Sequence, residues 1–336
     1  MIGALNMAEE HEKCGEKKHQ WGILTNGKIS MENVLRLKIL VVGASGQLGM
    51  ALMEELPHFS ELFSEVVGTY CQGKDKSHGK DKKNNPPLIQ LDLQNQAQVN
   101  SVILKLNPSI IINAAAMTHV DRCEEFPDLA ESINAQGHFY LAEAAKKIAA
   151  KLVFISTYYV FDGTKGYYNE DDAPNPLNIY AKTKLLGEQI TLKYADSLLF
   201  RTSKIYSLGY DQRNFLARLV AQFKAKEKIP MTNDQYTNPI STRDAAAAIA
   251  QLIAKGLSGV YHLGGPDNLN NYEFALAVAE KYGFDAELLQ PRTTEQFAAP
   301  ALRPKRCALD VHKLIKQVGF EPHSIDTNLT LWKNQI

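Results

Sequence analysis

The chain has 336 residues, 45% of them hydrophobic, which is enough for a sizeable core in one large or two small domains. Lysine plus arginine and aspartate plus glutamate each number 37, so the formal net charge is zero and bulk charge does not favour a nucleic-acid binder. No apolar run approaches the roughly 20 residues of a membrane span, and the four cysteines are too scattered for a metal or redox pair, so we expect reduced thiols and a cytoplasmic protein.

Residues 1–35 are polar and mixed in charge, and they lack the apolar segment of a secretory signal. We expect them to form a disordered leader. Met31 stands just before the globular pattern begins and is a candidate alternative start. A functional N-terminal arm is the other interpretation, although these residues offer no chemistry for one.

A glycine-rich turn separates the first predicted strand from the first predicted helix. The run 36–42 is apolar and rich in branched residues, which is typical of a buried parallel strand, and 50–56 has helical spacing. Glycines with the spacing G-x-x-G-x-x-G between them let backbone N–H groups approach a pyrophosphate at the helix N-terminus. In this position the turn predicts dinucleotide binding, although taken alone it also fits a tight turn. Its candidate cofactor contacts are Gly43, Ser45, Gly46, Gln47, Leu48 and Gly49.

Strands and helices then alternate along the chain. The predicted strands cover 65–71, 88–93, 109–113 and 151–156, and the predicted helices cover 97–106 and 130–150. This alternation predicts an α/β fold with a doubly wound parallel sheet of Rossmann type. Ligands bind such a sheet beyond the carboxyl ends of its strands.

The end of the second strand bears on the choice of cofactor. An acid there would bind the adenosine ribose of NAD, but none occurs before Asp75. Lys74 suits the 2′-phosphate of NADP(H), which we favour, while NAD(H) remains possible. Residues 73–87 are expected to form a solvated loop. Asp92 is a candidate acceptor for the adenine amino group, with a helix N-cap as the alternative.

Tyr180 and Lys184 lie four residues apart at the start of a predicted helix, so they share one face. A tyrosine can give or take a proton, and a lysine one turn away favours the phenolate and lowers the tyrosine pKa. The preceding strand ends in Ser156 and Thr157, whose hydroxyls can hold the reacting oxygen. These are the parts of a carbonyl reductase when a hydride donor is bound beside them, although the spacing alone also describes an ordinary surface pair.

Together these motifs resemble the extended short-chain dehydrogenase/reductases, from about residue 37 to the C-terminus. Longer phrases narrow the resemblance to the dTDP-4-dehydrorhamnose reductase group. They cover residues 113–121 (NAAAMTHVD), 159–163 (YVFDG), 176–188 (PLNIYAKTKLLGE), 200–203 (FRTS), 233–239 (NDQYTNP) and 302–304 (LRP). Several linked phrases in order are more specific than any single motif.

The resemblance implies NADPH- or NADH-dependent reduction of the 4-keto group of a nucleotide-linked deoxysugar, preferably dTDP-linked, in the synthesis of surface polysaccharide such as lipopolysaccharide. It makes Tyr180 the general acid, with Lys184 lowering its pKa and bonding the nicotinamide ribose, and with Thr157 orienting the carbonyl. Asn134 also matches a family position, with an ordinary helix amide as the alternative. The further cofactor contacts that the resemblance implies are Lys74, Asp92, Leu93, Ala114, Ala115 and Ala116.

The chain departs from the family pattern at two positions. Tyr158 stands where the family usually has an acid, and Lys204 stands where the group often has an aromatic residue. Tyr180 and Lys184 are still present, so the predicted reaction class does not change. The identity of the sugar is not determined by the resemblance. Arg303 suits a diphosphate, with a domain-bridging salt link as the alternative. The implied substrate contacts are Thr118, Ser156, Tyr158, Lys204, Asn214, Gln235 and Arg303.

We expect a dinucleotide-binding domain of residues 36–202 and about 241–257, and a substrate-binding domain of residues 203–240 and about 258–336. Ser241 or Thr242 is the expected cap of the returning helix. A homodimer is possible, and no metal site is expected because the histidines lack a second ligand at a sensible spacing. Two other functions stay open: reduction of a different keto or aldehyde nucleotide sugar, and a non-catalytic role like that of the regulatory beta subunit of methionine adenosyltransferase.

Overall fold

The computed structural model describes residues 37–71, 88–194, 196–208 and 214–335. By its internal contacts the chain from Leu35 to Ile336 forms one compact unit. The predicted leader and Lys74 lie outside the described residues.

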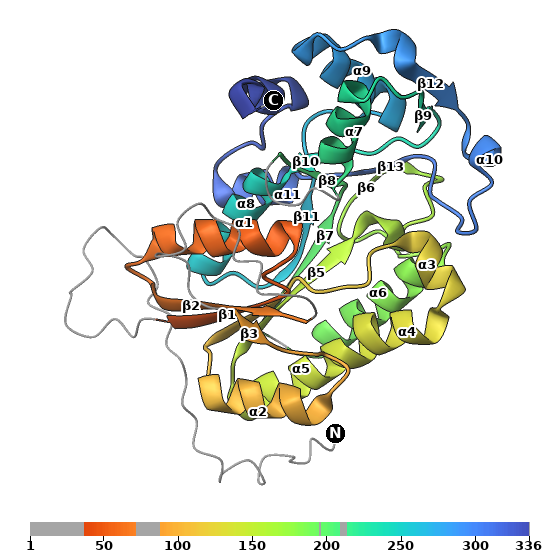
Figure 1. Ribbon diagram of the computed structural model, residues 1–336. Coiled ribbons are helices and arrows are strands. Elements are labelled where there is room, and N and C mark those ends of the chain that lie inside the picture. Colours follow the sequence, from red (N-terminus) through yellow and green to blue (C-terminus); the bar gives the residue numbers. More distant parts are fainter. Residues whose placement is uncertain (1–36, 72–87, 195, 209–213, 336) are drawn as a thin grey trace, which may run out of the picture. The chain divides into compact units, whose positions relative to one another are not determined.

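A seven-stranded sheet forms the centre of the fold, and all of its paired strands are parallel (Figure 1). Its strand order is β11-β7-β5-β4-β1-β2-β3. The bounds are β1 Leu37–Val42, β2 Phe63–Tyr70, β3 Ile89–Gln90, β4 Ile110–Asn113, β5 Lys151–Thr157, β7 Ser197–Thr202 and β11 Gly259–Leu263. The order reverses between β1 and β4, which is where doubly wound sheets open a ligand crevice. The predicted fold class is confirmed.

Helices cover both faces of the sheet. Figure 1 shows α1 (Gln47–Glu55) and α8 (Thr242–Ala254) on one face and α2 (Gln96–Leu106), α5 (Gly137–Lys147) and α6 (Ile179–Thr191) on the other. Ile103 of α2 and Leu141 of α5 share a buried cluster with Leu40 and Ile111 of the sheet. Burial on both faces explains why the central strands are continuous apolar runs.

The helix predicted over residues 130–150 is not continuous. It consists of α4 (Pro127–Glu131), a π-helical turn (Ser132–Gln136) and α5, and it ends before Ala149, whose φ is 53°. The alanine-rich spacing predicts helix, but it does not reveal the extra residue of a π turn. Such turns often mark functional sites, and this one contains Asn134.

The strand β11 changes the predicted domain boundary. It pairs in parallel with β7 and completes the main sheet after α8. Residues 259–263, which we expected in the substrate-binding domain, therefore belong to the cofactor-binding sheet. The short apolar run of β11 did not indicate which sheet it would join.

The remaining elements lie outside the main sheet and the helices already named. They are α3 (Val120–Glu125), β6 (Gly166–Tyr168), β8 (Ile205–Tyr206), α7 (Phe215–Lys224), β9 (Ile229–Thr232), β10 (Ile240–Ser241), α9 (Asn271–Tyr282), β12 (Leu289–Arg292), α10 (Thr294–Phe297), β13 (Cys307–Leu309), α11 (His312–Val318) and α12 (Ile325–Leu331). Short 3-10 turns cover Leu56–Phe59, Tyr158–Val160, Ala286–Leu288 and Lys333–Gln335. No helix among the described residues has the length and apolar character needed to cross a membrane.

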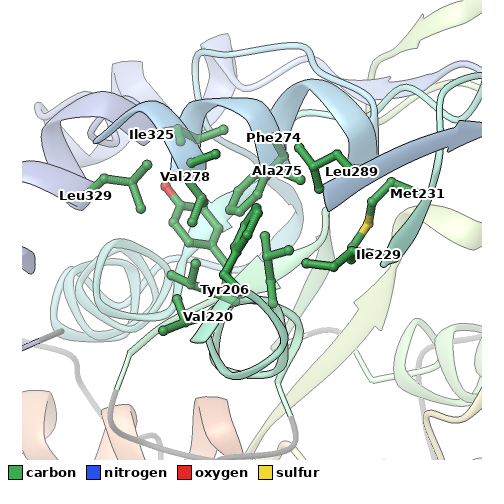
Figure 2. Close-up of a cluster of buried hydrophobic side chains, with 14 residues drawn as sticks. Tyr206, Val220, Ile229, Met231, Phe274, Ala275, Val278, Leu289, Ile325 and Leu329 are labelled. Carbon is green, nitrogen blue, oxygen red and sulfur yellow. The ribbon is translucent and has the colours of Figure 1, made fainter. Parts of the chain in front are cut away.

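Part of the C-terminal half has an apolar core of its own (Figure 2). In this cluster Phe274 and Val278 of α9 pack with Tyr206 and Val220, and the rings of Tyr206 and Phe274 meet edge to face at 5.1 Å. The strands β8 and β10 pair at the edge of this region. A separate core is what a substrate-binding domain requires, and the division into two domains stays a prediction.

Candidate active site

The glycine turn after β1 contacts the loop after β4. Gly43 has a φ of 81°, and a Cβ on it would lie 2.8 Å from backbone atoms of Ala115. A Cβ on Gly49 would lie 2.2 Å from the carbonyl oxygen of Gly43. Side chains at these two positions would clash, so the glycines bring the start of α1 close to both loops. The first N–H groups of a helix have no partner within the helix and suit a pyrophosphate.

The other predicted cofactor contacts surround this turn. Ser45 and the alanines 114–116 are half-buried, whereas Leu48 and Leu93 are buried in the core. The Gln47 side chain is engaged elsewhere, because its Nε2 donates to Ser207 Oγ at 3.0 Å and to Thr242 Oγ1 at 2.8 Å. Only the Gln47 backbone is therefore a plausible cofactor contact.

Asp92 lies beside the end of β2. Its Oδ1 accepts a hydrogen bond from the Gln94 N–H at 3.0 Å. Burial is the main cause of the raised pKa of Cys71, and the nearby Asp92 carboxylate raises this pKa further. The N-cap of α2 is Asn95, so the alternative role of Asp92 as a helix cap is wrong. Its position next to β2 keeps it a candidate for the adenine amino group.

Asn134 ties the loop after β4 to α6. Its Oδ1 accepts from the Met117 N–H at 2.8 Å, and its Nδ2 donates to the Met117 carbonyl at 3.2 Å and to Thr183 Oγ1 at 3.1 Å. The side chain is buried with all of these bonds made. Asn134 therefore holds the cofactor-side loop against the helix that carries Tyr180.

The helix α6 presents a polar face to the sheet. Asn178 caps its N-terminus by accepting from the Ala181 N–H at 2.8 Å, which places Tyr180 in the first turn. Tyr180, Lys184 and Glu188 follow at four-residue intervals, with 9%, 2% and 1% of their surfaces exposed. An ordinary surface pair would be solvated, so that alternative for Tyr180 and Lys184 is wrong.

Thr157 lies against Tyr180 at the carboxyl end of β5. Burial raises the pKa of Tyr180, and the hydrogen bond with Thr157 offsets only part of the increase. The direction of the Tyr180 pKa is therefore opposite to the lowering that we expected from Lys184, and the role of Lys184 toward Tyr180 stays a prediction. The phenol is protonated near neutral pH, which is the form that a proton donor needs.

The ammonium group of Lys184 lies over an aromatic ring. Its Nζ is 4.0 Å from the centroid of Phe154, which also packs against the His138 ring at 4.1 Å. Burial lowers the pKa of Lys184 to about 7, against the opposing effect of Glu188. Within the described residues no hydrogen bond engages Lys184 Nζ, so its donors are available to a ligand.

Ser156 has a different position from the one expected of a substrate contact. Its side chain is buried, and its hydroxyl donates to Glu188 Oε1 at 2.5 Å. Arg201 binds the same carboxylate through Nη2 at 2.9 Å and Nε at 3.1 Å. The Ser156 hydroxyl therefore belongs to a buried ion-pair network rather than to the catalytic trio.

Tyr158 and Tyr159 occupy the turn after Thr157. Tyr158 packs beside Cys307 and Phe161, and burial raises its pKa well above the usual value. The Tyr159 ring lies edge-on to the Tyr180 ring at 5.8 Å between centroids. Tyr159 was not among our predicted site residues, although its place two positions after Thr157 is the signal that could have found it.

Arg303 makes the salt link that we considered as its alternative role. Its Nη2 lies 2.7 Å from Asp121 Oδ2, and the Ala301 N–H donates to the same carboxylate. Burial raises the pKa of Asp121, but these hydrogen bonds outweigh burial and hold the pKa below its usual value. The link joins α3 to the C-terminal segment, next to Tyr159.

The remaining substrate candidates are spread more widely. Thr118 is exposed at the start of α3, and Asn214 caps α7 by accepting from the Ala217 N–H at 3.0 Å. Gln235 Nε2 donates to Thr294 Oγ1 at 3.0 Å. Lys204 is half-buried over the Phe215 ring, and its Nζ bonds Asn271.

Burial and the nearby Arg218 lower the pKa of Lys204 to about 8. Among the described residues, no hydrogen bond or ring contact joins these four side chains to Tyr180. Across the described part of the chain, no cluster of three or more His, Cys, Asp or Glu side chains is placed to hold a metal ion.

A parallel sheet with a glycine turn at its switch point, and a buried Thr-Tyr-Lys set beside it, define the short-chain dehydrogenase/reductase class. The family model described as RmlD substrate binding domain matches residues 37–335, so the chain belongs to that family. The resemblance predicted from the motifs is confirmed.

Similar proteins include the spore coat polysaccharide biosynthesis protein SpsK of Bacillus subtilis, 34% identical over 85% of this chain and 93% of that protein. The beta subunit of methionine adenosyltransferase 2 of Bos taurus is 30% identical over 89% of each chain. Among solved structures, dTDP-4-dehydrorhamnose reductase of Bacillus anthracis in complex with NADP is 32% identical, covers 90% of this chain and 100% of its own, and has a TM-score of 0.77.

Proposed function

We propose that the chain is an NADPH-dependent oxidoreductase that reduces the 4-keto group of a nucleotide-linked deoxysugar. The observation that carries the proposal is the buried set of Thr157, Tyr180 and Lys184 beside the glycine turn. A regulatory protein has no need of a buried lysine with unused donors next to a protonated phenol. The similar reductase that binds NADP supports both the cofactor and the sugar class.

The residues present fit a nicotinamide dinucleotide. Gly43 and Gly49 lack the Cβ atoms that would clash with Ala115 and with the Gly43 carbonyl, so the turn folds tightly and leaves the first N–H groups of α1 for a pyrophosphate. The free donors of Lys184 suit the hydroxyls of the nicotinamide ribose. When bound, the cofactor supplies the hydride.

The chain's own residues supply the proton and the orientation. The Tyr180 hydroxyl donates its proton to the carbonyl oxygen of the sugar, while Thr157 hydrogen-bonds the same oxygen and fixes its direction. Lys184 stabilises the phenolate that remains, because an opposite charge nearby favours the ionised form. Tyr158, Lys204 and Arg303 are proposed to select the sugar and its diphosphate, and Arg303 would exchange its bond with Asp121 for one with a phosphate.

A spectrophotometric assay tests this function. The protein is given NADPH and dTDP-4-keto-6-deoxy-L-mannose, or a panel of 4-keto nucleotide sugars, and loss of the reduced nicotinamide band is followed. We expect turnover, and Tyr180→Phe is expected to abolish it while NADPH binding is retained. Lack of oxidation with every sugar would refute the reductase, and full turnover by Tyr180→Phe would refute the assigned acid.

The similarity to the beta subunit of methionine adenosyltransferase keeps a second function open. In that case the chain would bind a dinucleotide and a partner protein without turning over any sugar. Co-purification with a methionine adenosyltransferase catalytic subunit, together with an inactive reductase assay, would favour it. A cytoplasmic location, a role in surface polysaccharide synthesis and a homodimer remain part of the first proposal, and gel filtration with light scattering tests the dimer.

A further inference from the structure

The carboxylate of Glu188 is held by four hydrogen bonds, one from Ser156 and three from Arg201. Ser156 Oγ lies 2.5 Å from Oε1, and Arg201 reaches Oε2 with Nη2 at 2.9 Å and Nε at 3.1 Å. Glu188 and Arg201 are 1% and 4% exposed. Carboxylates this deep are rare unless they are paired, and this one has a fixed position.

Glu188 is also the next residue along the face of α6 that carries Tyr180 and Lys184. Residues four apart on a helix are neighbours, with Cβ atoms about 5–6 Å apart. Burial costs the Lys184 ammonium its solvation, and the Phe154 ring below it gives only partial compensation. A negative charge one turn away is the remaining source of stabilisation on this face.

We propose that Glu188 is a positioning residue of the reaction, which supplies the buried negative charge that keeps Lys184 charged and directed toward the cofactor and Tyr180. The role rests on the proposed function. Arg201 and Ser156 hold the carboxylate in place. The direction of the Lys184 pKa supports the assignment: burial lowers it, and Glu188 raises it.

Few other ionisable groups act on Lys184. Its own helix contributes Tyr180 and Glu188, and α5 contributes His138, whose pKa burial lowers to about 3 with a further effect of Lys184, so the ring is neutral. From β7 comes Arg201, whose guanidinium binds the Glu188 carboxylate. Tyr159, in the turn after β5, contacts the ring of Tyr180. Cys123 of α3 belongs to the same buried cluster as Tyr180.

The test measures the charge of Lys184 directly. Protein carrying ¹³C-labelled lysine is titrated with pH, and the ε-methylene signal of Lys184 is assigned by its absence in Lys184→Arg. In Glu188→Gln we expect the midpoint to fall by about one unit, the lower end of the effect of a nearby opposite charge. Loss of reductase activity with rising pH is expected to begin about one unit lower as well.

Two further variants separate this role from a structural one. Glu188→Gln leaves Arg201 buried without its partner and can fail to fold, so Glu188→Gln/Arg201→Met removes both charges together. A lowered midpoint in that double variant supports the proposal, and a wild-type midpoint overturns it. Glu188→Asp keeps the charge and is expected to restore part of the shift, and Ser156→Ala keeps the carboxylate and is expected to leave the midpoint within a few tenths of a unit.

The two proposals fail separately. A lowered midpoint in a protein that reduces no sugar supports the charge relation and refutes the proposed function. An unchanged midpoint in a fully active double variant refutes the role of Glu188 and leaves the reductase intact.

Discussion

Gly187 sets the distance between α6 and the strand beneath it. A Cβ at this position would lie 2.4 Å from Phe154 Cζ and 3.2 Å from the carbonyl oxygen of Asn134. Ordinary contact begins at 3.4 Å, so Gly187→Ala requires a displacement of 3.4 − 2.4 = 1.0 Å. The Phe154 ring is fully buried and packs against the His138 ring, tilted by 33°, so close packing resists its displacement.

The displacement has two calculable effects. Overpacking of this kind costs about 1–3 kcal/mol, which corresponds to a Tm lower by roughly 2–5 °C in a unit of this size. Because the Phe154 ring lies directly under Lys184 Nζ, the lysine shifts too, and a misplacement of about 1 Å can cost on the order of 10²-fold in rate. We therefore expect kcat to fall much further than stability does.

Thermal unfolding, NADPH fluorescence titration and kcat are measured on Gly187→Ala, Phe154→Leu and the double variant. The smaller leucine makes room for the new methyl group, so the double variant is expected to recover most of the Tm that Gly187→Ala loses. The double variant also lacks the aromatic ring under Lys184, so its NADPH affinity is expected to be weaker than that of wild type. This coupling is the quantity that a double-mutant cycle isolates. A Gly187→Ala protein with wild-type Tm and kcat, or additive effects in the cycle, would refute the reasoning.

Two further predictions concern links between distant segments. The folded-state pKa of Asp121 lies below the unfolded one, so its bond to Arg303 stabilises the fold above about pH 4 and is lost as pH falls further. A partly exposed pair contributes about 1 kcal/mol or less, so Asp121→Asn should unfold at most about 2 °C below wild type at pH 7. The difference in Tm should vanish near pH 2. A difference that stays constant with pH would contradict this. Gln47→Ala removes the hydrogen bonds to Ser207 and Thr242, worth roughly 1–3 kcal/mol together, so its Tm should fall by several degrees, and a wild-type Tm would show that water replaces the amide.

Local patterns in the sequence are sufficient for the main sheet and the catalytic pair. Residues 39–42 of β1 are all apolar because both faces of the strand are buried there, which is the usual pattern of a buried parallel strand. Tyr180 and Lys184 are found by spacing alone because one helix carries both. Ser241, one of the two predicted caps of α8, is the N-cap because capping depends on neighbours only three residues away.

Contacts between distant residues explain what could not be predicted. Arg303 and Asp121 are 182 positions apart, so the sequence favoured a phosphate site for Arg303 and offered the salt link only as an alternative, without its partner. The Ser156 hydroxyl is directed to Glu188, 32 residues away, and no local pattern distinguishes it from the hydroxyl of Thr157. The π turn at Asn134 depends on Met117 in the same way, because its geometry follows from a bond to another loop.

The pairing of β8 with β10 has a consequence for how this fold can diversify. Ile205 pairs with Ile240 and Tyr206 with Ser241, so residues 207–239 leave and rejoin the scaffold at one point. Closing such an excursion costs little loop entropy, but the stretch is anchored beyond its ends, because β9 pairs with β12 and Val220 of α7 packs against Phe274 of α9. A chimera that takes residues 207–239 from another family member therefore also needs the matching residues of α9 and β12 to keep this core.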